Sequence, residues 1–268
     1  MTHDLLVVDL HAQINTLVFN KKDGKFEGYG EQHVWTHRSG LTRLLYYDDL
    51  LIPHHIDVMH TKKNVAEALW VTMMDIYDKS KDNVKARVDL AMLCDRPSQE
   101  MRPPACRKNW SRPKADFVLA KKHRREVLEW IKMLLFPDGY AVNLRRGVNL
   151  NTLRVLGMKS HDYHIWIEQL LPVMVRGYVP DHIWVVLVEL SYFFHQLCAK
   201  EVSRSVLLAL EVAVPMLVYK LEKIFPPGFF LLMQHLIMHL PYEARMGGRP
   251  RPLVLSNREM LQVPLEKM

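Results

Sequence analysis

Hydrophobic and polar residues alternate in two different ways along the chain, and the pattern changes near residue 40. Before that point, two short apolar runs at residues 5–10 and 14–19 have the length of β-strands, and a turn-rich stretch follows them. From Leu41 onward, apolar residues recur every three or four positions, which is typical of amphipathic helices. The chain is therefore expected to be mainly α-helical, with a short irregular or β-containing N-terminal segment.

Helical spacing divides the rest of the chain into a series of predicted helices. The first two lie between residues 64 and 94, and Asp82 or Asn83 is the predicted N-cap of the second, because short polar side chains accept hydrogen bonds from free backbone N–H groups. A Pro-rich stretch then interrupts the pattern, since proline breaks helices. The remaining predicted helices, which suggest a bundle, cover residues 121–136, 161–176, 181–199, 203–225 and 226–240.

These changes of pattern divide the chain into four segments. A basic, Pro-rich connector over residues 96–120 separates an N-terminal segment, residues 1–95, from a helical domain over residues 121–246. Residues 247–268 begin with Pro and Arg and show no sustained hydrophobic period, so we expect a disordered tail there. The predicted fold class is mainly α, with a helical bundle as the C-terminal domain.

Composition restricts the class of protein without identifying it. Hydrophobic residues make up 49% of the chain, enough for a sizeable core, and the net charge of +7 permits an anionic partner such as nucleic acid without requiring one. The three cysteines are widely spaced, which indicates reduced thiols rather than a disulfide framework. The most apolar segments are interrupted by Glu189, Glu211 and Pro215, so no membrane-spanning helix is predicted.

The connector and the start of the next helix form the most basic part of the chain. Between Arg102 and Arg125, nine basic residues are accompanied by one acid, Asp116. Basic side chains around an aromatic residue suit a phosphate backbone with a stacked base, and a solvated loop beside a basic helix face is the alternative explanation. The candidate DNA-binding residues are Arg107, Lys108, Trp110, Arg112, Lys114, Lys121, Lys122, Arg124 and Arg125.

Histidine clusters raise the question of a metal or catalytic site. Three histidines accompany Asp57 between residues 54 and 60, and imidazole and carboxylate groups can ligate metals. His235 and His239 share one helical face, but the zincin signature needs a Glu where this chain has Leu236. Both groups are more simply explained as structural. The spacing of residues therefore predicts no metal site and no cofactor.

Several stretches, taken together and in order, resemble a known family. Residues 54–69, HHIDVMHTKKNVAEAL, are similar to the segment HNIDVMHTEKNV of the plant CACTA (En/Spm-type) transposases. The resemblance covers residues 23–248, and its last four blocks fall in the domain of unknown function that follows the transposase core. The further blocks are DKSKDNVKARVDLAMLCDRP, FPDGYAVNLRRGVN, MKSHDYHIWIEQLLPVMVRGYVP, ELSYFFHQLCAK and LEKIFPPGFFLLMQHLIMHLPYEARMGG.

The resemblance implies a chemistry that this chain is not expected to perform. The family cuts and joins DNA ends with three acids on a ribonuclease-H-like core, which hold divalent metals such as Mg²⁺. One of these acids is expected at Lys62, whereas Asp57, His60, Lys63 and Asn64 match the family. An ammonium group repels Mg²⁺ instead of binding it. The 61 residues before Lys62 are too few for the sheet that carries the other acids, so the N-terminal segment is interpreted as a core remnant without catalytic residues.

The main functional hypothesis is a degenerate, catalytically inactive, transposon-derived protein of the plant nucleus. It is expected to bind DNA weakly, or other transposase or host proteins through the helical bundle, and to use no cofactor. One alternative is an active metal-dependent DNA-processing fragment, in which Asp57 or Glu67 replaces the lost acid. The other is a host-adopted protein–protein adaptor without a role on DNA. The resemblance stops after Gly248, and a shift of the reading frame would produce such an unrelated tail.

Overall fold

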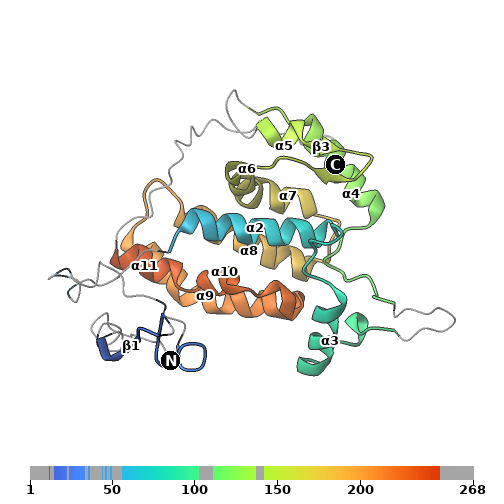
Figure 1. Cartoon of the computed structure of the whole chain (residues 1–268). Helices are drawn as coiled ribbons and strands as arrows, with labels where there is room; N and C mark the ends of the chain where they lie inside the picture. Colours follow the sequence, from blue (N-terminus) through green and yellow to red (C-terminus); the bar gives the residue numbers. More distant parts are fainter. Residues whose placement is uncertain are drawn as a thin grey trace. The chain divides into compact units, whose positions relative to one another are not determined.

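The chain folds into two compact units, and the boundary between them lies between His55 and Ile56. The second unit, which runs to Arg245, contains helices α2 to α10 and most of α11 (Figure 1). The mainly helical fold that the sequence predicts is confirmed. The computed structural model describes residues 12, 15–22, 24–33, 36, 44, 46, 49, 56–102, 111–136 and 142–247.

The described part of the first unit contains a short antiparallel β-hairpin. Strand β1 (Phe19–Asn20) pairs with β2 (Lys25–Phe26), and the two Phe rings meet edge to face with centroids 5.3 Å apart. Gly24, with φ +65°, takes the left-handed conformation that the turn before β2 requires, which glycine adopts without steric cost. Of the strand expected over residues 14–19, only Phe19 is in a strand, because Asn15 and Thr16 are helical, and β2 lies in the stretch expected to be a turn-rich loop. The strand expected over residues 5–10 lies outside the described residues.

The second unit is a set of helices joined by turns and one further hairpin. Its longer helices are α2 (Val58–Met73), α3 (Val84–Leu93), α4 (Lys121–Met133), α8 (Asp181–Leu197) and α9 (Arg204–Ile224). Its shorter elements are the 3₁₀ turns η3 (Pro97–Gln99) and η5 (Pro227–Phe229), the π-helix η4 (Trp166–Leu170), helices α5 (Val142–Arg146), α6 (Ser160–Ile165), α7 (Leu171–Val175), α10 (Leu232–Leu236) and α11 (Leu240–Met246), and the antiparallel strands β3 (Val148–Asn149) and β4 (Arg154–Val155).

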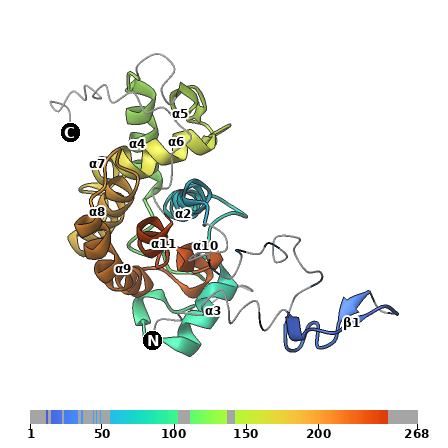
Figure 2. The same cartoon turned by 90° about the vertical axis from the view of Figure 1, so that its left-hand side faces the viewer.

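Helix α2 lies at the centre of the second unit, where it packs against α6 and α10 (Figures 1 and 2). Eleven of its sixteen residues are buried, so α2 is a core helix rather than the amphipathic surface helix that the spacing of its apolar residues predicts. Its Trp70 meets Trp166 of η4 edge to face, with ring centroids 5.4 Å apart. Neighbouring helices therefore surround α2 on most of its circumference.

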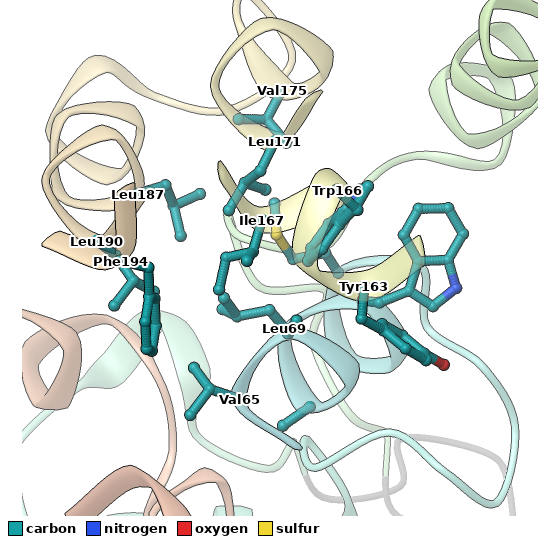
Figure 3. Close-up of a cluster of buried hydrophobic side chains, with 14 of the residues drawn as sticks. Val65, Leu69, Tyr163, Trp166, Ile167, Leu171, Val175, Leu187, Leu190 and Phe194 are labelled. Atoms are coloured by element: carbon teal, nitrogen blue, oxygen red, sulfur yellow. The ribbon is translucent and has the colours of Figure 1, made fainter. Parts of the chain in front are cut away.

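Figure 3 shows the hydrophobic core that α2 shares with the segments from α6 to α8. Val65 and Leu69 of α2 point into a cluster that the other segments complete from the opposite side. Because this core joins α2 to helices beyond residue 160, the compact unit runs across the segment boundaries that the sequence pattern places at residues 95 and 120. The other labelled side chains are Tyr163, Trp166, Ile167, Leu171, Val175, Leu187, Leu190 and Phe194.

Helix α3 begins with Asn83 as its cap, one of the two predicted residues. The Asn83 side chain accepts a hydrogen bond from the Ala86 N–H at 3.0 Å, while Asp82 is buried. Turn η5 packs against α3, and Gly228 makes this possible because a Cβ atom there would lie 2.9 Å from the Ala86 Cβ. The helix predicted over residues 226–240 is instead divided into η5, α10 and the start of α11, and η5 lies against α3 at Gly228.

Helices α8 and α9 pack side by side and are joined by a short turn (Figure 1). Ser203 caps α9 by accepting a hydrogen bond from the Val206 N–H at 3.3 Å. Helix α9 continues through Pro215, which has no N–H to donate to the preceding turn. Within the described residues, no helix has both the length and the apolar character needed to cross a membrane.

Candidate nucleic-acid interface

The motif that resembles the transposases forms the first turns of α2. Asp57 is the N-cap, and its carboxylate accepts a hydrogen bond from the His60 N–H at 2.9 Å. The Asn64 side chain donates to the His60 carbonyl at 2.9 Å, and Lys63 pairs with Glu67 one turn further along the helix. These side chains stabilise the start of a helix, so Asp57 and Glu67 each have a structural partner.

Lys62 is buried in the core, and its side chain is 3% exposed. Its ammonium group pairs with Glu168 of the π-helix η4, and the Cys198 sulfur lies 3.7 Å from Lys62 Nζ. Glu168 is also 4.0 Å from Nδ1 of His195 on α8. A buried charge needs a close partner, which Glu168 supplies. Burial, more than any neighbouring charge, raises the pKa of the Cys198 thiol.

No cluster of three or more His, Cys, Asp or Glu side chains with metal-ligand geometry occurs among the described residues. His54 and His55 lie outside those residues. The pair at His235 and His239 has its two Nε2 atoms 3.2 Å apart. Burial and the neighbouring His235 lower the pKa of His239, although Glu243 opposes them. The two rings hydrogen-bond to each other, and both residues are exposed.

His164 is buried close to the Lys62 pair, and neither of its ring nitrogens has a hydrogen-bond partner among the described residues. Burial lowers its pKa from 6.5 to about 3, the positive charges of Lys62 and His161 add to this effect, and Asp57 opposes it. The imidazole is therefore neutral at physiological pH, and protonating it requires either a buried charge or a local change of structure.

Acidification is expected to destabilise the second unit through His164. Because His164 titrates near pH 6.5 when unfolded and at about 3 when folded, the unfolded state binds more protons between these values. The contribution of neutral His164 to stability is therefore fully present above pH 6.5, and it decreases as the pH falls from 6.5 towards 3. Urea unfolding should show a loss of about 2 kcal/mol between pH 7 and pH 5, from about 1.4 kcal/mol per pH unit below the unfolded pKa.

Two variants isolate the contribution of His164 to this pH dependence. His164→Leu removes the titrating group and the unpartnered ring nitrogens, so its stability should change by less over the same pH range. His182→Leu removes an exposed histidine from α8 and should retain the pH dependence of the unaltered chain. An identical pH dependence in both variants would show that His164 is not the responsible group.

Two of the candidate DNA-binding arginines are turned inward. Arg112 donates to one carboxylate oxygen of Asp75 at 2.8 Å, and Arg124 lies 3.9 Å from the other. Arg124 also donates to the Met74 carbonyl at 2.8 Å, and Arg112 donates to the Asp82 carbonyl. These contacts hold the connector and α4 against the end of α2, so the two arginines are structural rather than free surface charges.

The remaining described candidates lie on the surface. Lys114, Lys121, Lys122 and Arg125 are exposed, the last three on the first turns of α4. Helix α4 has no side-chain cap and no acid in its first turn, which leaves its positive N-terminal end exposed to an anion. Lys122 is only loosely paired, 3.8 Å from the carboxylate of Glu126. Arg107, Lys108 and Trp110 lie outside the described residues.

Elements next to α4 contribute basic residues that the sequence interpretation missed. Helix α5 and strand β3 pack against α4, and Arg145 and Arg146 of α5 are exposed. Arg154 on β4 is half-buried, and residues 142–161 contain no acid. The absence of acids is visible in the sequence, but the position of this stretch beside α4 is not. We define the basic surface as Lys121, Lys122 and Arg125 of α4, Arg145 and Arg146 of α5, and Arg154 of β4.

Comparison with known proteins identifies one region of the chain. Residues 197–263 match the family model of DUF4218, a domain of unknown function. The DUF4218 region begins at the last residue of α8 and includes α9, α10 and α11. It extends to residue 263, beyond the expected end of the resemblance at Gly248. It begins after residues 136–149 and 158–180, so two of the four blocks expected in the domain of unknown function lie outside the match. No curated protein and no solved structure matches the chain.

Proposed function

We propose that this chain binds nucleic acid through the basic surface and is a degenerate, catalytically inactive relative of the CACTA transposases. The observation that carries the proposal is the packing of α5 and strand β3 against α4, because α4 exposes Lys121, Lys122 and Arg125 and α5 exposes Arg145 and Arg146. Exposed Lys and Arg side chains bind phosphates and release counterions, a mode that needs no base-specific contact.

Two further observations support the transposase relationship. The DUF4218 region is of a type typically found in plant transposase-like proteins, and the ordered blocks of residues 23–248 point to the same source. The loss of catalysis rests on Lys62, which occupies the position expected for a metal-binding acid and pairs with Glu168. Such a protein would act in the nucleus, where its DNA substrate is.

Reversing three charges on α4 is expected to weaken DNA binding by about 10- to 100-fold at low salt. The variant Lys121→Glu/Lys122→Glu/Arg125→Glu removes three phosphate contacts, so the slope of log affinity against log salt should also decrease by about 3. Fluorescence anisotropy with a labelled DNA duplex, repeated over a series of salt concentrations, measures both quantities.

A matched triple variant distinguishes the basic surface from net charge. Lys79→Glu/Lys85→Glu/Lys200→Glu changes the net charge by the same amount at three exposed positions outside the basic surface, and should bind DNA almost as the unaltered chain does. Equal losses in both variants, or no binding by the unaltered chain at low salt, would contradict the proposal. Cleavage of the duplex on addition of Mg²⁺ would instead support the alternative of an active enzyme.

A further inference from the structure

The outward face of α9 carries no charged residue over about four turns. Leu208, Val212, Met216 and Tyr219 are 44%, 82%, 55% and 48% exposed, and their spacing of four, four and three residues aligns them in one stripe. Single exposed apolar residues are ordinary, but a contiguous stripe indicates a contact surface. The other exposed residues between positions 205 and 219 are Ser205, Ala209, Ala213 and Pro215.

The charges that flank this α9 stripe are used within the chain. Glu211 accepts hydrogen bonds from Arg245 of α11, with the Nε of Arg245 at 2.8 Å. Lys220 donates to both carboxylate oxygens of Glu189 on α8, at 2.7 and 2.8 Å. These pairs fasten α9 to its neighbours, so the stripe lies between two ion pairs. At the C-terminal end of the stripe, the exposed Lys223 ammonium lies 4.6 Å from the centroid of the Tyr219 ring.

The α9 stripe is complementary to itself under a two-fold axis. If the axis passes between residues 213 and 214, Leu208 faces Tyr219 of a second copy, and Val212 faces Pro215, next to Met216. Closed dimers use such an isologous contact, in which one patch meets an identical patch. The four side chains then fill the seam between two antiparallel helices without a gap in the stripe and without a charge in its middle.

Among the exposed charges at the ends of α9, Arg204 and Glu222 favour the antiparallel arrangement, while Lys223 lies over the Tyr219 ring. Arg204 and Glu222 are eighteen residues apart, which is about five turns, so both lie on the same side of the helix. Both are exposed, and neither has an ion-pair partner within 4.0 Å among the described residues. Arg204 lies at the positive N-terminal end of the helix dipole and Glu222 at its negative C-terminal end, so the dipole of α9 itself stabilises neither charge.

We propose that the α9 stripe is an antiparallel, two-fold interface with a second copy of this chain. The two-fold axis places Arg204 of each copy beside Glu222 of the other, on the same edge of the seam. A parallel pair would place like charges together. Helix α3 also exposes apolar residues, among them Met92, but its exposed side includes Lys85 and Asp89 and is only about half as long.

Val212→Glu is expected to dissociate this dimer, because it places two carboxylates in the apolar seam. Sedimentation velocity should show a dimer for the unaltered full-length chain and a rise of at least about 30-fold in the dissociation constant for Val212→Glu. Met92→Glu, at a position 79% exposed on α3, is the matched control and should leave the dimer intact. A monomer at every concentration, or dissociation by Met92→Glu instead, would overturn the proposal.

A charge exchange tests the antiparallel register directly. Arg204→Glu and Glu222→Arg should each weaken the dimer, because each places two like charges together at both ends of the seam. The double variant Arg204→Glu/Glu222→Arg restores opposite charges and should regain the dimer. Failure of the double variant to recover, with α-helical circular dichroism unchanged in all three proteins, would rule out this register.

Discussion

Lys62→Glu is expected to lower the free energy of unfolding by about 3–5 kcal/mol. The substitution restores the acid expected from the transposases, but it places a carboxylate beside Glu168 in a site where the Lys62 side chain is 3% exposed. The two carboxylates repel each other, and the one at position 62 has no partner of opposite sign, while Glu168 keeps only His195, 4.0 Å away. Urea unfolding followed by circular dichroism measures the loss.

The neighbouring residue provides the control for this substitution. Lys63→Glu makes the same charge change one position along, where the side chain is 28% exposed and pairs with Glu67 on the surface, so the loss should be below about 1 kcal/mol. The exchange Lys62→Glu/Glu168→Lys should recover most of the stability. A Lys62→Glu variant that stays stable and gains Mg²⁺ binding in calorimetry would instead identify position 62 as part of a surviving metal site.

Arg87→Met is expected to lower the free energy of unfolding by about 3–5 kcal/mol, because it also leaves a buried charge without its partner. Arg87 is fully buried and donates through Nε and Nη2 to the Asp82 carboxylate, the second contact at 2.8 Å. Its Nη1 donates to the Gln99 carbonyl at 2.7 Å, which ties the segment after α3 to that helix. The variant leaves Asp82, 1% exposed, without its bidentate partner, and thermal and urea unfolding should both register the loss.

Matched substitutions separate the buried charge from the loss of the arginine side chain. The double variant Arg87→Met/Asp82→Leu removes both charges and should recover at least half of the stability, because a buried ion pair can be replaced by apolar groups. Arg125→Met, at an exposed position of α4, should change stability by less than about 0.5 kcal/mol. A double variant as unstable as Arg87→Met would mean that the arginine acts mainly through its backbone contact at Gln99.

The two buried ion pairs and the basic surface assign different roles to charges that look alike in the sequence. Lys62 and Arg87 are buried and each pairs with one carboxylate, and Arg112 and Arg124 pair with Asp75 at the end of α2. Lys121 and its exposed neighbours on α4 remain available to an external anion. The proposed binding of nucleic acid therefore depends on fewer residues than the nine basic side chains between Arg102 and Arg125 suggest.

The sequence by itself determined the local features of this protein. Apolar spacing predicted the fold class and the positions of α8 and α9, and side-chain chemistry predicted Asn83 as one of two possible caps of α3. The resemblance identified Lys62 as the departure from the expected acid. These features depend on residues within a few positions of one another, since helical period and capping are interactions along one stretch of chain.

Only the tertiary structure decided which charges are buried and which distant segments pack together. Lys62 and Glu168 are 106 positions apart, and nothing in the local pattern of either stretch indicates that they meet. The same holds for Arg112 and Asp75, and for the packing of α5 against α4 that extends the basic surface. Hydrophobic periodicity specifies which face of a helix is buried, but ion pairs and surfaces depend on which distant segments the shared core brings together.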